Sequence, residues 1–170
     1  MKKQFIVASL LISFIFTLSA CGPKTSQDIM SKELGLSISG GKEILNYDTY
    51  SNGEGISCIA LSFNNDTVLN EIKENPEWKS FPLDDSVHTL VYGSEDEKSK
   101  VDPFVSDAEG KPIIPTIKNG YYLLIDRHAE TEINILDRGS FNFTIGLYDV
   151  ASNTLYFCKL DTWAYKGINY

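Results

Sequence analysis

Histidine is scarce in this chain, and the short motifs of common enzyme active sites are missing. Only two histidines, His88 and His128, occur among the 170 residues. There is no Gly-x-Ser-x-Gly elbow, which presents the nucleophile of many hydrolases, and no His-Glu-x-x-His pair, which binds zinc in metallopeptidases. The sequence therefore predicts no metal site and no cofactor, and it points to no specific reaction.

Positive charge is also in short supply. The chain has 15 Lys and Arg against 23 Asp and Glu, a net charge of −8. Phosphates repel a strongly acidic domain, so we expect no nucleic acid partner. The chain also lacks internal repeats and low-complexity segments, and its length suits one domain.

The only long apolar run lies at the start of the chain. Lys2 and Lys3 precede an almost unbroken apolar stretch over residues 5–16, which is short for a permanent membrane span. The stretch ends in Leu18-Ser19-Ala20-Cys21, which resembles the bacterial lipobox. That resemblance implies a diacylglyceryl group on the Cys21 thiol and cleavage just before it. An ordinary signal peptide with a nearby cysteine and an uncleaved anchor are the alternatives.

The lipobox resemblance sets the expected organisation of the chain. Residues 1–20 are a signal peptide, residues 21–36 a lipidated N-terminus and tether with a short helix, and residues 37–170 a globular domain. The protein is expected at the cell membrane, facing outside the cytoplasm and held by the lipid on Cys21. Two acyl chains on one residue give stable anchoring.

Two cysteines remain after Cys21, namely Cys58 and Cys158. Both lie in segments with strand character, and the compartment outside the membrane permits disulfides. A bridge between them and two separate buried thiols are both compatible with the sequence.

The hydrophobic pattern predicts an α+β fold: a single domain, mainly an antiparallel sheet with one or two covering helices. Alternation with a period of two is clearest over residues 141–148 and 155–160, and Asn52-Gly53 is a strong hairpin turn. We expect helices over 26–34, capped by Ser26, and over 66–75, and strands over 43–50, 56–63, 87–92, 120–127, 141–148 and 155–160. Residues 94–119 read as irregular, with one short strand near Ile113-Ile114.

Four segments resemble, as a set, an uncharacterised family of small lipoproteins and secreted proteins of low-GC Gram-positive bacteria. They read YDTYSNGEG, ENPEWKSFPL, NGYYLLIDRH and RGSFNFTIGLYDVASNTLYFCKLDT. This chain has Tyr50 where the family pattern has a histidine, and Glu54 within the turn. The family carries no activity to transfer, so the resemblance implies only the fold and the compartment.

One polar segment is a candidate catalytic site. The sequence IDRHAE places Asp126, Arg127, His128 and Glu130 at the end of a strand. A carboxylate of Asp126 or Glu130 that orients His128 would make that histidine a general base. The simpler interpretation is an ion cluster in which Arg127 pairs with Asp126 or a neighbouring acid. A zinc site that combines His128 with His88 has no spacing to support it.

Two further motifs have a functional and a structural interpretation. Trp78 and Phe81 follow a predicted helix, where they form either an exposed recognition patch or a cover for the edge of the core. Asp48, Asn52 and Gly53 match part of a calcium loop, but decisive ligands are missing, which favours a plain hairpin turn.

The sequence therefore favours a membrane-anchored binding or interaction module of the cell envelope without catalysis. Its partner would be an envelope protein or a small ligand. The alternative is a small envelope hydrolase that uses His128 with Asp126 or Glu130.

Overall fold

The computed structural model describes residues 25–97 and 99–162. Within these ranges the chain forms three α-helices, eight strands and one 3-10 helix. In chain order they are α2 (Ser26–Leu34), β1 (Lys42–Asp48), β2 (Gly55–Ser62), α3 (Thr67–Glu74), β3 (Lys79–Ser80), α4 (Asp85–Tyr92), β4 (Ser94–Glu95), β5 (Lys100–Val101), β6 (Gly120–Asp126), η2 (Ile135–Asp137), β7 (Asn142–Asp149) and β8 (Thr154–Asp161). This confirms the predicted α+β domain with a mainly antiparallel sheet.

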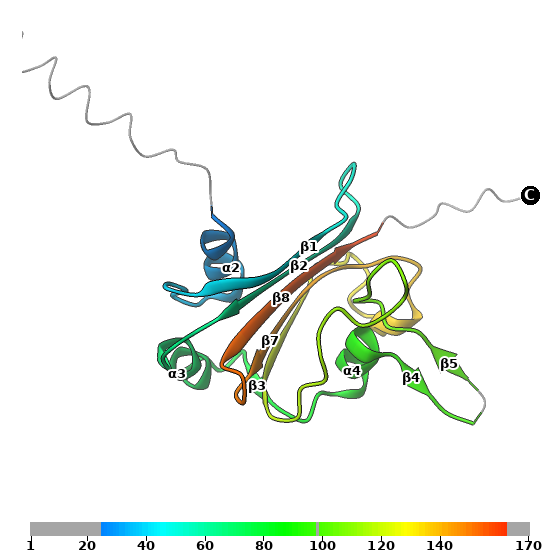
Figure 1. The fold of residues 1–170 in the computed structure, drawn as a ribbon. Coiled ribbons are helices and arrows are strands. Elements are labelled where there is room, and N and C mark those ends of the chain that lie inside the picture. The colour runs from blue at the N-terminus through cyan, green and yellow to red at the C-terminus, as the bar shows by residue number, and fades with distance from the viewer. Residues whose placement is uncertain (1–24, 98, 163–170) are drawn as a thin grey trace, which may run out of the picture.

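Six strands form one antiparallel sheet in the order β1-β2-β8-β7-β6-β3. Figure 1 labels β1, β2, β8 and β7 side by side within it. Strands β4 and β5 form a separate small hairpin. Strand β8 lies between β2 and β7, so it joins the β1–β2 hairpin to the β6–β7–β8 meander. The β1–β2 turn is tight, because Asn52 and Gly53 both have positive φ angles, 53° and 89°.

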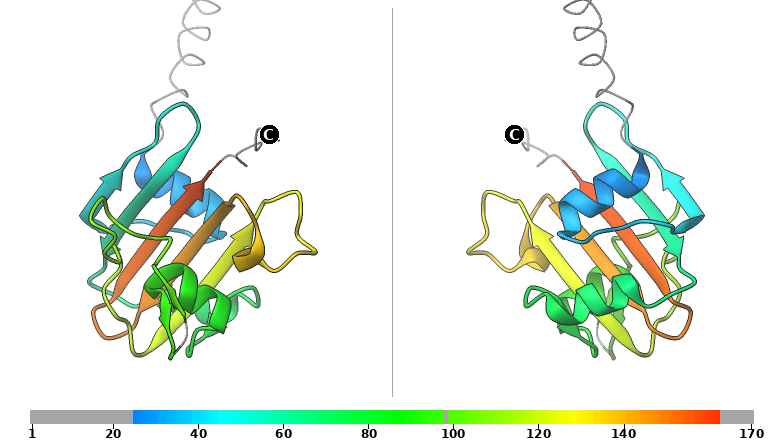
Figure 2. Two further views of the ribbon diagram at one scale, coloured as in Figure 1. Left: turned by 90° about the vertical axis from the view of Figure 1, so that its right-hand side faces the viewer. Right: turned by 90° about the vertical axis from the view of Figure 1, so that its left-hand side faces the viewer.

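Both faces of the sheet are covered. Helices α2 and α3 lie against one face, and α4 lies against the other (Figures 1 and 2). Side chains along a strand alternate between the two faces, so each strand contributes to two apolar clusters. The α4 face buries Ile56, Ala60, Phe143, Ile145, Leu147, Val87, Leu90 and Val91. The α2–α3 face buries Ile59, Leu61, Leu155, Phe157, Met30, Leu34, Val68, Leu69 and Ile72. Because Met30 and Leu34 are in this cluster, α2 is part of the folded domain.

Cys58 and Cys158 form a disulfide within the sheet. They are directly opposite each other on β2 and β8, with Cα atoms 4.1 Å apart, and both are buried. They are 100 residues apart in the sequence. Closing a loop of this size is worth up to about 4–5 kcal/mol in the chain-entropy account.

The prediction of a strand over 87–92 is wrong, because this segment is helix α4. The β-branched residues Val87, Thr89 and Val91 imitate strand alternation, but Val87, Leu90 and Val91 are the residues that pack into the core. Asp84 begins the helix, since its side chain accepts a hydrogen bond from the backbone N–H of Val87 at 2.8 Å.

Two smaller predictions also need correction. Helix α2 is capped by Thr25 rather than Ser26, and Thr25 forms a capping box with Asp28. No strand covers Ile113-Ile114 in the described part of the chain. Instead Ser106 and Pro112 form an isolated bridge nearby.

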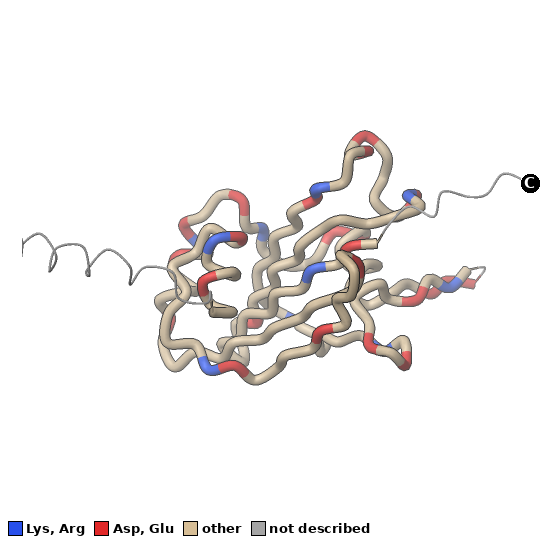
Figure 3. Tube along the Cα trace, turned by 90° about the horizontal axis from the view of Figure 1, so that it is seen from above, with Lys and Arg blue, Asp and Glu red and all other residues tan. Residues whose placement is uncertain are grey.

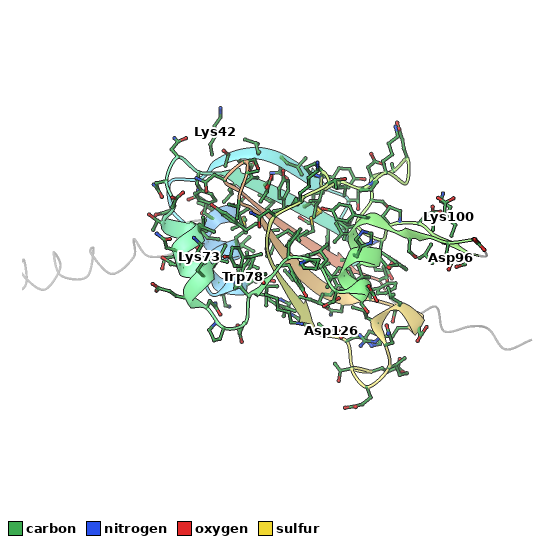
Figure 4. All side chains as sticks on the ribbon, turned by 90° about the horizontal axis from the view of Figure 1, so that it is seen from below. Lys42, Lys73, Trp78, Asp96, Lys100 and Asp126 are labelled. Atoms are coloured by element: carbon green, nitrogen blue, oxygen red, sulfur yellow. A yellow bond between two sulfur atoms is a disulfide. The ribbon has the colours of Figure 1, made fainter. Side chains whose placement is uncertain are left out.

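A glycine in the middle of β7 lets two large side chains reach the sheet. A Cβ atom on Gly146 would lie 2.8 Å from Cη2 of Trp78 and 2.9 Å from Cδ2 of Leu34. Both side chains are buried, and Figure 4 shows Trp78 within the layer of side chains at the α3 end of the sheet. The packing of α2 therefore depends on the missing side chain at position 146.

Replacing Gly146 by alanine should destabilise the domain by about 1–3 kcal/mol, because Trp78 and Leu34 must move to make room. Urea unfolding monitored by tryptophan fluorescence measures the change. Gly139→Ala is the matched control, since no atom lies within 4 Å of its added Cβ. Equal stability of both variants and the native chain would contradict this account of the packing.

Candidate functional site

His128 lies just after β6, in a hollow at one end of the sheet. The hollow has a volume of about 400 Å³, and we call it the sheet-end hollow. Its lining comes from the ends of β6, β7 and β8 and the segments beside them: Arg127, His128, Ala129, Ser140, Phe141, Asn142, Asp161 and Thr162. Arg127, His128 and Ala129 of the segment IDRHAE therefore form part of the lining of a surface depression.

Both ring nitrogens of His128 are engaged. Nδ1 accepts a hydrogen bond from the backbone N–H of Glu130 at 3.0 Å. The neutral ring therefore carries its proton on Nε2, which lies 2.9 Å from Oγ of the buried Ser140. In this tautomer Nε2 donates to the serine and has no lone pair with which to remove the serine proton.

The carboxylates proposed to orient His128 do not contact its ring. Oδ1 of Asp126 accepts the backbone N–H of His128 at 3.1 Å, and Oδ2 forms an ion pair with Nη1 of Arg138 at 2.7 Å. Glu130 contacts the ring only through its backbone. The structure therefore brings Asp126, His128 and Glu130 together without the relay that a general base needs.

Arg127 pairs with a residue far away in the sequence rather than with Asp126. Its Nη2 lies 2.7 Å from Oε2 of Glu33 on α2, and its Nη1 donates to Oγ1 of Thr144 at 2.8 Å. Lys159 on β8 also pairs with Glu33, at 3.1 Å. This cluster fastens α2 to β7, to β8 and to the residue that follows β6. Sequence reasoning missed Glu33 because it is 94 residues from Arg127.

The Glu33 cluster favours the ionised carboxylate. Burial opposes ionisation, but the hydrogen bond and charge of Lys159, the hydroxyl of Thr144 and the charge of Arg127 together outweigh it. The pKa of Glu33 is therefore lowered from its ordinary value of 4.5.

Of the two interpretations of Trp78 and Phe81, the structure supports cover of the core and contradicts an exposed recognition patch. Trp78 is only 6% exposed and belongs to the cluster under α2 and α3. Phe81 is partly buried on the opposite side, where its ring packs edge-on against Tyr122 at 6.2 Å. The two rings lie in different clusters and serve the core.

The remaining candidate residues do not form a metal site in the described residues. No group of three or more His, Cys, Asp or Glu side chains is placed there to hold a metal ion. The ring of His88 packs against Tyr92 instead, at 5.4 Å. Cys21 and the rest of the lipobox lie outside the described residues.

A second depression lies beside β6, on the edge of the sheet. We call it the β6-edge groove, and its volume is about 530 Å³. It runs between the start of α4 and the segment before η2, and its lining is Asp84, Asp85, Ser86, Leu124, Asp126, Thr131, Glu132, Ile133, Asn134, Ile135 and Arg138. Figure 4 shows Asp126 at the end of β6, where this groove begins.

The groove lies where strand pairing stops. Strand β3 pairs with β6 only at Tyr121 and Tyr122, and Phe81 then donates its N–H to the carbonyl of Gly120. No described strand pairs with the outer side of β6 beyond Tyr122. Arg127 donates its N–H to the carbonyl of Asn142 on β7, while Gly120 accepts from Phe81 on the other side. Because backbone groups alternate along a strand, Leu124 and Asp126 face outward and form an open sheet edge.

One wall of the groove is held by Arg138. Its side chain is only 3% exposed, and its Nε and Nη2 atoms donate to the carbonyl of Ile133 at 3.0 and 2.8 Å. Together with the ion pair to Asp126, these bonds fix the segment before η2 against the end of β6.

No protein-family model, curated protein or solved structure matches this chain. The resemblance to small Gram-positive lipoproteins therefore remains a prediction. In the described residues, no helix has the length and apolar character needed to cross a membrane.

Replacing Glu33 by glutamine should cost about 1 kcal/mol of folding stability near neutral pH, because the ion pairs to Arg127 and Lys159 are lost. The lowered pKa of Glu33 determines how its contribution to folding stability depends on pH. The contribution of Glu33 is complete above pH 4.5 and disappears as the pH falls through its lower folded pKa. Chemical unfolding across this pH range measures the difference from the native chain.

Glu74→Gln is the control, since it removes an exposed carboxylate from the end of α3. A deficit of Glu33→Gln that stays constant down to the most acidic pH would show that the effect is not electrostatic.

Proposed function

We propose that this chain is a lipid-anchored extracytoplasmic protein that binds another protein of the cell envelope without catalysing a reaction. The observation that carries the proposal is the open edge of β6 beside the β6-edge groove. Helices already cover both faces of the sheet, so its edges offer the accessible backbone.

The other edge of the sheet is less suited to a partner. Strand β1 has an irregular register between Glu43 and Leu45, and charged residues stand at both of its ends, Lys42 and Asp48. Bulges and charges are features by which natural sheets discourage pairing at an edge. This contrast supports β6 as the binding edge.

Anchoring would keep the domain close to the membrane. Four residues separate the lipobox Cys21 from the start of helix α2, and such a segment spans at most about 14 Å. A partner bound by the anchored form would therefore be a membrane protein or a protein held near the bilayer.

The hydrolase alternative rests on the contact between His128 and Ser140. A histidine within 2.9 Å of a buried serine hydroxyl resembles part of a nucleophilic pair. The proton on Nε2 and the ion pair of Asp126 with Arg138 oppose that role, so the binding function is the better supported proposal.

Photo-crosslinking in cells should trap one dominant partner when a benzoylphenylalanine replaces Ile133, which is 43% exposed at the groove. The same replacement at Ile44, an exposed isoleucine on β1 at the other edge, should trap none. The Cys21→Ala form should lose the partner because it lacks the anchor. Equal products from both positions, or no product from either, would count against the proposal.

An ester hydrolysis assay distinguishes the binding proposal from the hydrolase alternative. Under the binding proposal, the native chain, His128→Ala and Ser140→Ala should hydrolyse p-nitrophenyl acetate and butyrate at the same background rate. A hydrolase would instead lose about a hundredfold in rate or more in each variant. Circular dichroism spectra of the variants show whether a loss comes from unfolding.

A further inference from the structure

We infer that the partner adds a short, extended, basic segment to β6 as a further antiparallel or parallel strand, with its side chains in the β6-edge groove. This inference rests on the proposed function and names the chemistry of the partner and its mode of binding.

The backbone of β6 provides the first argument. Pairing with β3 ends at Tyr122, while pairing with β7 continues to Asp126. The outer side of the strand is thus free along a length of roughly 13 Å. Within it, Leu124 and Asp126 direct their backbone groups outward. Leu123–Ile125 are apolar, the stretch contains no proline, and its one charge, on Asp126, is paired with Arg138. A regular strand without proline or an unpaired charge is a good template for pairing.

The groove provides room for the side chains of an added strand. Alternate side chains of such a strand point to the α4 face, where the groove lies over Leu124. Ile133 forms an exposed apolar surface on the far wall. The volume of about 530 Å³ is sufficient for one or two side chains of intermediate size.

The charged residues around the groove determine which charge a bound segment should carry. Asp126 is neutralised by Arg138, and Asp84 lies 3.8 Å from Nζ of the exposed Lys79. Asp85 and Glu132 form no ion pair with a described residue, so the rim carries uncompensated negative charge. Basic side chains therefore complement this groove.

A second copy of this chain does not suit the groove. The chain carries −8 overall, and acidic residues lie on several of its loops and turns (Figure 3). Like charge opposes self-association through an acidic rim. The occupant is therefore a basic segment of a different protein.

Three labelled hexapeptides test the inference by fluorescence polarisation: Lys-Val-Lys-Val-Lys-Val, its Glu-Val counterpart, and the lysine peptide methylated at every backbone nitrogen. Only the unmodified lysine peptide should bind, because methylation removes the donors of a strand but keeps the charges. Hydrogen exchange should then slow at the amides of Leu124 and Asp126, which face away from β7. Equal binding of the methylated peptide, or no binding of any peptide, overturns the inference.

Charge reversal tests the location. The double variant Asp85→Lys and Glu132→Lys should weaken binding of the lysine peptide by about tenfold or more. The control variant is Glu74→Lys with Glu95→Lys, which changes the net charge by the same amount. Both residues are exposed, on α3 and β4. Equal weakening in both variants means non-specific attraction and rejects the groove. Asp85→Asn with Glu132→Gln should give an intermediate effect, and urea unfolding shows that each variant is folded.

The crosslinking and peptide experiments together distinguish failure of this inference from failure of the proposed function. Suppose that crosslinking at Ile133 traps a partner, that reversing Asp85 and Glu132 does not affect it, and that no peptide binds. The proposed binding function then stands, and the inference of an added basic strand is rejected. Loss of the crosslink in cells while peptide binding persists rejects the proposed envelope partner instead.

Discussion

The pairing of β2 with β8 is the constraint on which the rest of the structure depends. These strands lie next to each other over eight residue pairs, from Gly55–Asp161 to Ser62–Thr154, and the Cys58–Cys158 disulfide crosslinks them. Without this contact the β1–β2 hairpin and the β6–β7–β8 meander would be separate units. The surfaces that support α2, α3 and α4 all extend across this junction.

Polar interactions at one end of the sheet hold elements in place. Glu33 connects α2 to β7, β8 and the residue that follows β6, and Asp126 connects β6 to the segment that Arg138 positions. Of the residues first considered as a reaction centre, Asp126 therefore supports the β6-edge groove, while Arg127 and His128 line the sheet-end hollow. Their arrangement fits recognition better than catalysis. Nδ1 of His128 accepts the backbone N–H of Glu130, so the proton of the neutral ring is on Nε2, beside Ser140.

The sequence predicted the fold well where a local pattern decides the structure. The alternation in β7 and β8, the Asn52-Gly53 turn and the helix over residues 67–74 all follow from nearby residues. Helix α4 was missed because Val87, Thr89 and Val91 satisfy a strand pattern, and only the Asp84 cap indicates a helix. The Glu33 cluster and the open edge of β6 depend on the order of strands in space, which no local pattern contains.

The position of β8 has a consequence for how the domain is made. Among the strands of the large sheet, β8 is the last in chain order, yet it occupies a place between β2 and β7. When the chain emerges from the ribosome or crosses a membrane from its N-terminus, β2 and β7 are present before the strand that separates them. Until β8 is made, Cys58 lacks the disulfide partner that it has in the folded domain. Over the same interval, β2 and β7 each present a strand edge that β8 later covers.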